Sequence, residues 1–380
     1  MKKIIIGIGR FFKEADIFLL ALSLISAIYG VILISSTVIS PMMRAPNAVY
    51  VQVGAIVIGL FLFVLFSYID IDIIADKAVF LFIFSVLFIS TLFIWGIGDA
   101  VGRRAWLRFF DIGIQPAEIV KVTFIIIIAK MMMNFKDRKT LNSVLSMGQL
   151  VVVFGVMFGL VWQVSQDIGT ALVYLAMFGM MLFINGVRLR WFVIGAATVG
   201  ITFPFFWTYL LSERQRNRIL APFLQEQIDP LRQDLLWQTD RSLEAIASGG
   251  FSGQGLGNGR LTQAGLVPAQ HTDFIVSVAG EELGFIGIML IIALLVAIII
   301  RCMYVGAKSN NPLGMIVCTG IAAKFIAQTV MNLGMCLGIL PVIGVTLPFF
   351  SYGGSSIVTC FAALGIVSGI KMRPKPLRFR

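Results

Sequence analysis

The segment His271-Thr272-Asp273-Phe274 holds the only histidine of the chain and directly precedes an apolar run. A carboxylate beside an imidazole can serve as a general base that removes a proton from a substrate. The same residues could instead begin a helix, since Thr272 or Asp273 can cap it and Asp273 complements its dipole. Ile275 excludes a capping box, because it lies three residues after Thr272. Taken alone, these residues favour capping, and catalysis by Asp273 is the alternative hypothesis.

Ionisable residues also interrupt the long apolar stretches, where such residues are costly and are usually functional or paired. Glu118 and Lys121 are three apart, so on a helix they share a face and predict an internal ion pair that fixes helix packing. Lys324, Gln328 and Asn332 are spaced by four, which places them in one polar stripe along a helix. Three further acidic residues stand in or beside apolar runs: Asp167, Glu281 and Glu282.

The composition decides what solvent surrounds these residues. Hydrophobic residues make up 58% of the chain and charged residues 13%, whereas a soluble domain has about 25% charged residues. A water-soluble protein is therefore excluded. The net charge of +11 would indicate nucleic acid in a soluble protein, but membrane topology explains it better, and we expect no nucleic-acid partner. The four cysteines show no metal-ligand spacing and are interpreted as small core residues.

A helix that crosses a bilayer needs about 20 mostly apolar residues. The chain contains ten such segments, at residues 16–38, 51–69, 78–98, 112–133, 147–164, 168–186, 191–211, 274–300, 313–338 and 349–370. The sequence thus predicts an all-α polytopic membrane protein that forms a single integral membrane domain over residues 1–380. One large extracellular loop, residues 212–273, joins spans 7 and 8. Its glycine-rich part, residues 249–259, predicts a close approach of backbone to helices or substrate rather than a nucleotide loop.

Basic residues in the connections indicate the orientation of the spans. Lysines such as Lys77, Lys139 and Lys308 fall on one side, together with the basic tail, so both termini are expected in the cytoplasm. The basic residues expected outside are all arginine: Arg44, Arg103, Arg104, Arg108, Arg214, Arg216, Arg218, Arg232, Arg241 and Arg260. The planar arginine fork binds phosphate through two hydrogen bonds. Pairing with nearby Asp and Glu side chains is an equally good interpretation of these arginines.

Several motifs of the chain resemble those of the SEDS family, which includes RodA, FtsW and SpoVE. They are HTDFI at 271–275, GEELGF at 280–285, LPFFSYGGSS at 347–356, QPAE at 115–118 with Lys121, and DIGTA at 167–171. The resemblance runs from the first span to the last. The chain departs from the family pattern at Ala105, where arginine is usual, and at Ala117, where serine is usual. These departures affect substrate contacts and leave Asp273 untouched.

The resemblance implies a peptidoglycan glycosyltransferase that polymerises lipid II at the outer face of the bacterial plasma membrane, with a class B penicillin-binding protein as partner. Asp273 would take the proton from the acceptor sugar. The polyprenyl pyrophosphate leaving group would need arginines or a divalent cation, Mg²⁺ or Mn²⁺, and no residue is assigned as a metal ligand. The candidate substrate-binding residues are Arg104, Arg218, Arg241, His271, Gln115, Asp167 and Ser351. The candidate structural polar network comprises Glu118, Lys121, Glu281, Glu282, Lys324 and Asn332.

Two other functions fit ten spans with charges inside. A lipid II flippase would bind its substrate between the helices, but it should place polar residues in the inner half and needs no base at the outer mouth. A scaffold for other cell-wall enzymes would not explain why the arginines and Asp273 gather outside. Within the family, a RodA-like role in elongation and cell shape is favoured over an FtsW-like role in division or a SpoVE-like role in sporulation, because the chain has no long terminal extensions.

Overall fold

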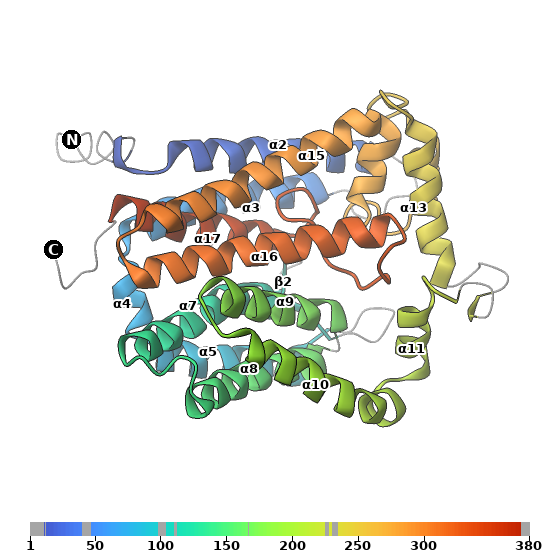
Figure 1. Ribbon diagram of the computed structural model, residues 1–380. Coiled ribbons are helices and arrows are strands. Elements are labelled where there is room, and N and C mark those ends of the chain that lie inside the picture. The colour runs from blue at the N-terminus through green and yellow to red at the C-terminus, as the bar shows by residue number, and fades with distance from the viewer. Residues whose placement is uncertain are drawn as a thin grey trace.

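The computed structural model describes residues 11, 13–39, 47–97, 104–109, 112–165, 167–224, 228–229 and 235–373. Within them the chain is almost entirely helical (Figure 1). The elements are α2 (Ile17–Ile39), α3 (Ala48–Tyr68), α4 (Ile71–Ala75), α5 (Ala78–Ser90), α6 (Leu92–Trp95), β1 (Leu107–Phe109), β2 (Ile112–Ile114), α7 (Pro116–Asp137), α8 (Val144–Ser165), α9 (Ile168–Ile184), α10 (Leu189–Phe205), the π-helical turn η1 (Phe206–Leu210), α11 (Glu213–Leu220), α13 (Leu235–Gly249), α14 (Arg260–Gln263), α15 (Ile275–Lys308), α16 (Pro312–Cys336) and α17 (Gly354–Met372).

Each of the ten predicted spans contains a helix of the structure. Among the described residues, eight helical segments are long and apolar enough to cross a bilayer: α2, α3, α5 with α6, α8, α10 with η1, α15, α16 and α17. The other two are α9, which has 17 residues, and α7, which has 22 residues and carries several charges. The predicted all-α polytopic membrane fold is confirmed. The start of α2 and the end of α17 lie at the same end of the bundle (Figure 1).

Two predicted boundaries are wrong. The fourth span does not begin at residue 112, because residues 112–114 pair with Leu107–Phe109 in an antiparallel hairpin. The helix begins instead at Pro116, the first helical position, where the missing N–H of proline has no cost. The last span does not begin at residue 349, since Phe349 adopts a φ of 69° and the helix starts at Gly354. In both places, non-helical backbone precedes the helix and links it to its neighbours.

The helices differ sharply in burial. Most of α16 and α17 is buried, so these two helices form the centre of the bundle. Helix α17 packs closely on α3, because a Cβ atom at Gly365 would lie only 2.6 Å from the Phe63 carbonyl oxygen. At the other extreme, α10 is described throughout and has no buried residue. The apolar side chains of α10 therefore face lipid.

A break divides α15 at Gly284. This glycine has a φ of 67° and a ψ of −161°, so α15 consists of a short segment, 275–283, and a longer one, 285–308. The break lies within the predicted span 274–300, and only the longer segment continues as a regular helix. A break removes the helical partners of the carbonyls of Glu281 and Glu282 and of the N–H groups of Phe285 and Ile286.

The glycine-rich loop supplies all four missing backbone partners. The N–H groups of Gln254 and Gly255 donate to the two carbonyls at 3.0 and 2.9 Å, and the carbonyls of Gly250 and Phe251 accept from the two N–H groups at 2.9 and 3.3 Å. Gly253 makes this approach possible, because a Cβ atom there would overlap the backbone of the broken helix. The close approach of backbone to a helix that the glycines predict is therefore present.

The large loop, residues 212–273, contains three of the helices given above: α11, α13 and α14. The longest of them, α13, extends over 15 residues. Helices α11 and α13 lie at the end of the bundle opposite the start of α2 (Figure 1). Leu236 and Ala245 of α13 are buried, and Ser242 bonds to Ser277 of α15 at 2.6 Å. The loop is thus packed onto the helices below it.

Candidate active site

Asp273 lies in a turn, residues 271–274, between the large loop and α15. The N-cap of α15 is Phe274, whose side chain makes no capping bond. Neither Thr272 nor Asp273 therefore occupies the capping position, and the interpretation of these two residues as the N-cap is wrong. Asp273 is partly exposed.

The backbone of this turn is held by the C-terminal third of the chain. The carbonyl oxygens of the three consecutive residues 271–273 each accept a hydrogen bond. The donors are the N–H of Tyr352 at 2.8 Å, the hydroxyl of Ser351 at 2.6 Å and the amide Nδ2 of Asn332 at 2.8 Å. Because α16 and the segment before α17 supply these donors, the most buried part of the bundle positions the turn.

Ser351 is predicted as a substrate contact, but its environment favours a positioning role. The side chain is only 2% exposed. Its hydroxyl donates to the Thr272 carbonyl and accepts a bond of 2.8 Å from the N–H of Leu347. With both bonds made inside the protein, Ser351 links the loop before α17 to the turn that carries Asp273.

His271, two residues before Asp273, contacts Tyr352, and Arg108 acts electrostatically on Tyr352. The rings of His271 and Tyr352 are 5.6 Å apart. Burial lowers the pKa of His271 below its usual 6.5, so the imidazole is neutral at pH 7. Burial raises the pKa of Tyr352, and the positive charge of Arg108 on β1 opposes this shift. Arg108 is thus the cation that acts electrostatically on the Tyr352 phenol.

Sequence reasoning did not single out Arg108 among the ten outer arginines. The hairpin brings it to Tyr352: Arg108 pairs with Gly113, and the carbonyl of Gly113 accepts a bond of 3.3 Å from the hydroxyl of Ser355 on α17. The signal in the sequence was the pair of short segments 107–109 and 112–114, which form the hairpin. These segments are hard to separate from the apolar run of α7 that follows them.

The three predicted phosphate-binding arginines lie on different elements. Arg104 is exposed and precedes β1, Arg218 lies in the last turn of α11, and Arg241 lies on α13. Arg241 forms an ion pair of 2.6 Å with Glu244, one turn further along the same helix. This contact matches the alternative interpretation, in which outer arginines pair with acidic neighbours.

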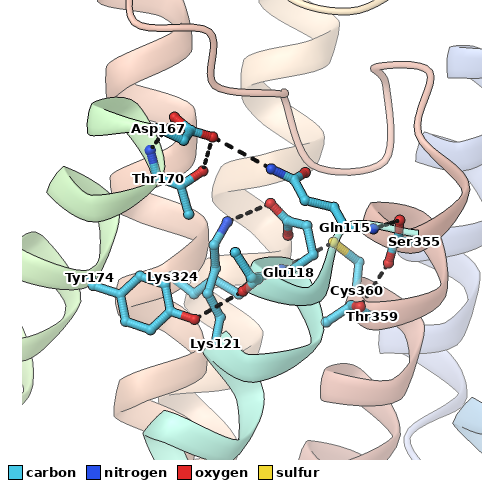
Figure 2. A network of polar contacts seen from close by, with 11 residues as sticks. Gln115, Glu118, Lys121, Asp167, Thr170, Tyr174, Lys324, Ser355, Thr359 and Cys360 are labelled. Atoms are coloured by element: carbon cyan, nitrogen blue, oxygen red, sulfur yellow. Dashed lines mark hydrogen bonds and ion pairs between the residues drawn. The ribbon is translucent and has the colours of Figure 1, made fainter. Parts of the chain in front are cut away.

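Gln115 and Asp167 are predicted as substrate contacts, yet both belong to a buried polar cluster (Figure 2). Asp167 is 4% exposed and caps α9, since its carboxylate accepts from the N–H of Thr170 at 3.0 Å and from its hydroxyl at 2.8 Å. The amide of Gln115, 8% exposed, points to the same carboxylate at 3.5 Å. These contacts favour a role inside the bundle over direct contact with a substrate at its surface.

Glu118 and Lys121 form an ion pair at the centre of this cluster. The Lys121 ammonium lies 2.5 Å from Glu118 Oε1, and the two side chains are 1% and 3% exposed. The fully buried Lys324 donates to the Cys360 thiol at 3.3 Å (Figure 2). Gln328 of the same helix faces Glu118. The polar stripe of α16 thus begins in this cluster and ends at Asn332, which bonds to Asp273.

Glu281 and Glu282 are fully buried beside the break in α15. Glu281 accepts bonds from the N–H groups of Leu261 and Thr262 at 2.7 and 2.8 Å, and thus binds the N-terminus of α14. Glu282 accepts a bond of 2.6 Å from the hydroxyl of Ser36 on α2. The two glutamates connect the large loop to α2 and α15.

No ligand set for Mg²⁺ or Mn²⁺ emerges from this arrangement. Among the residues that the structure describes, no group of three or more His, Cys, Asp or Glu side chains could hold a metal ion.

Comparison with known proteins places these motifs in a family. A family model for cell cycle proteins of the FtsW, RodA and SpoVE type matches residues 16–375. The chain belongs to this family. It is 35% identical to a probable peptidoglycan glycosyltransferase FtsW of Trichlorobacter lovleyi, over 76% of this chain and 75% of that protein. It is 31% identical to the peptidoglycan glycosyltransferase MrdB of Escherichia coli K12, over 86% of both chains.

Solved structures show the same fold. A chain in a peptidoglycan synthase complex that coordinates polymerization and crosslinking is 26% identical and has a TM-score of 0.79, over 95% of this chain and 98% of that chain. The rod shape determining protein RodA of Thermus thermophilus is 24% identical, with a TM-score of 0.66 over 94% and 96% of the two chains. The helical membrane architecture of the family is therefore common to all three.

Proposed function

We propose that this chain is a peptidoglycan glycosyltransferase that polymerises lipid II, with Asp273 as the general base. One observation carries the assignment of the base: Asp273 is a partly exposed carboxylate in a turn whose carbonyls at residues 271–273 are all held by the bundle. A base must lie within hydrogen-bond reach of the proton that it removes, and a fixed turn meets this need. The names of the relatives support the reaction class.

In this reaction the 4-hydroxyl of the acceptor sugar loses its proton to the Asp273 carboxylate. The oxygen forms a bond to the anomeric carbon of the donor sugar, and the bond from that carbon to the polyprenyl pyrophosphate breaks. The leaving group gains negative charge, which a preorganised cation stabilises. Arg108 acts electrostatically on Tyr352, whose ring contacts that of His271, so we assign Arg108 to the pyrophosphate, with the neutral His271 as a hydrogen-bonding group of the same site.

Three further assignments belong to this proposal. The end of the bundle that carries α11 and α13 (Figure 1) faces the outside, and both termini lie in the cytoplasm, as the lysine distribution indicates. The membrane is the bacterial plasma membrane. The partner is a class B penicillin-binding protein, which would crosslink the strands. The similar chain in a synthase complex that couples polymerization to crosslinking supports this partnership.

The test is polymerisation of lipid II by the purified protein with and without the base. Asp273→Asn preserves the size of the side chain and leaves the N-cap at Phe274 unchanged. We expect polymerisation to slow at least about 100-fold, the contribution typical of a general base. Asp76→Asn is the matched control, because this exposed carboxylate pairs with Lys130 and lies outside the site. A well-folded Asp273→Asn protein that makes glycan strands at the wild-type rate would refute the assignment.

Lipid II flipping is the second candidate, and the buried cluster around Glu118, Lys121 and Lys324 is the observation that favours it. Ionisable groups inside a bundle are typical of transport pathways. Translocation of lipid II in liposomes distinguishes the two functions. A flippase should move lipid II as fast with Asn at position 273 as with Asp, and should make no glycan strands in either case.

A further inference from the structure

We infer that Asn332 and Ser351 are positioning residues that aim the carboxylate of Asp273. The inference rests on the proposed role of Asp273 as the base and adds the groups that fix its direction. Asn332 is fully buried on α16, and its Nδ2 donates to the Asp273 carbonyl at 2.8 Å and to the Val345 carbonyl at 2.7 Å. Both protons of this amide are therefore used on backbone.

The two residues hold the two peptide planes that flank Asp273. The Ser351 hydroxyl bonds to the Thr272 carbonyl, which belongs to the peptide before Asp273. The Asn332 amide bonds to the carbonyl of Asp273 itself, which belongs to the peptide after it. Because a peptide is planar, fixing both planes fixes φ and ψ of the residue between them, and with them the direction of its Cα–Cβ bond. The carboxylate then retains only its own side-chain rotation.

The supports are themselves rigid. Cys336, one turn after Asn332, lies with its Sγ 3.6 Å from the same Asp273 carbonyl. The carbonyl of Cys336 accepts a bond of 2.7 Å from the Ser242 hydroxyl of α13, which also contacts Ser277 at 2.6 Å. Helices α13, α15 and α16 thus meet directly behind the turn. Asn332 and Ser351 therefore set the orientation of the Asp273 carboxylate through the backbone, without contacting the substrate.

Catalysis is sensitive to the position of the base, since a displacement of a catalytic group by about 1 Å can lower the rate about 100-fold. The first test is Asn332→Leu, which has a similar shape and no donor. We expect kcat to fall about 10- to 100-fold with KM within about threefold of wild type. The second variant, Ser351→Ala, removes one hydroxyl and should give the same split between kcat and KM. It keeps the inference testable if the leucine variant does not fold.

The matched control is Asn185→Leu. Asn185 is also a buried asparagine, and its Nδ2 donates to the Met181 carbonyl at 2.8 Å on α9, outside the turn. Loss of stability should be comparable in Asn185→Leu and Asn332→Leu, whereas only the latter should lose kcat. Equal kcat in these two variants, or a kcat equal to wild type in Ser351→Ala, would overturn the inference.

A comparison in the Asp273→Asn background separates positioning from general support of the fold. If Asn332 acts through the base, Asn332→Leu should leave the residual rate of Asp273→Asn unchanged within about twofold, because coupled residues do not add. A further loss as large as that in the wild-type background would assign Asn332 a structural role only. Failure of the proposed function looks different, since Asp273→Asn alone would then polymerise lipid II at the wild-type rate.

Discussion

Removing one charge of the Glu118–Lys121 pair should destabilise the protein more than removing both. The two side chains are 3% and 1% exposed, and their charged atoms lie 2.5 Å apart. Loss of one partner leaves a buried, uncompensated charge, which costs about 3–5 kcal/mol, whereas replacing the whole pair is often close to neutral. We therefore expect Glu118→Gln and Lys121→Met each to lower the free energy of unfolding by that amount. The double variant should lose less than either single variant.

Exchanging the two charges should restore only part of the loss. Lys324 acts electrostatically on Glu118, and Asp167 acts on Lys121. After the exchange Glu118→Lys with Lys121→Glu, a lysine would face Lys324 and a glutamate would face Asp167. Like charges in a buried site repel each other strongly. The order of stability should accordingly be wild type, the neutral double variant, the exchanged pair and then the single variants.

The assay is thermal unfolding of the purified protein in detergent, with expression level as a second readout. The exposed pair of Lys130 and Asp76 serves as the control: its atoms are 2.7 Å apart, but its side chains are 22% and 63% exposed. Lys130→Met should cost at most about 1 kcal/mol, the value for surface pairs. A neutral double variant at Glu118 and Lys121 that loses the sum of the two single losses would refute the reasoning.

Three further measurements test the site and the orientation. Arg108→Lys should slow polymerisation about tenfold or more, because the fork that binds pyrophosphate is lost, whereas Arg241→Lys should have little effect, since a lysine can keep the pairing with the neighbouring glutamate. Burial lowers the pKa of His271 in the folded protein, so the unfolded chain takes up the proton at a higher pH than the folded protein does. The free energy of unfolding should therefore fall as the pH drops below 6.5. Melting curves of His271→Gln should lack this part of the pH dependence. A cysteine placed at Gly257 should react with an impermeant reagent in intact cells, whereas one placed at Lys308 should be protected, and the reverse labelling would invert the proposed topology.

The features that follow from local spacing were predictable from the sequence. Apolar runs of fixed length gave the ten spans, because a bilayer sets the length of a helix. The face shared by Glu118 and Lys121 follows from helical periodicity, and the ion pair between them confirms it. The aspartate before α15 was recognised through its motif, because the residues alone favoured capping.

The features that depend on distant contacts were not predictable. The bonds from Asn332 and Ser351 to the turn of Asp273 join residues 59 and 79 positions apart. The acceptors of these bonds are backbone carbonyls, which every residue has, so no sequence pattern predicts the bonds. The break at Gly284 was missed because glycine is common in membrane helices and the apolar run continues on both sides. The hairpin before α7 was missed because its strands have only three residues each.

The four backbone hydrogen bonds between the glycine-rich loop and the break in α15 have a mechanical consequence. Four backbone groups that the break leaves without helical partners are paired by the loop alone, and each would cost several kcal/mol if it were exposed to lipid. Lifting the loop from the helix would expose all four together. The loop and α15 must therefore move as one rigid body. Any hinge in this part of the protein would lie at the borders of this body, before residue 249 or after the end of α15.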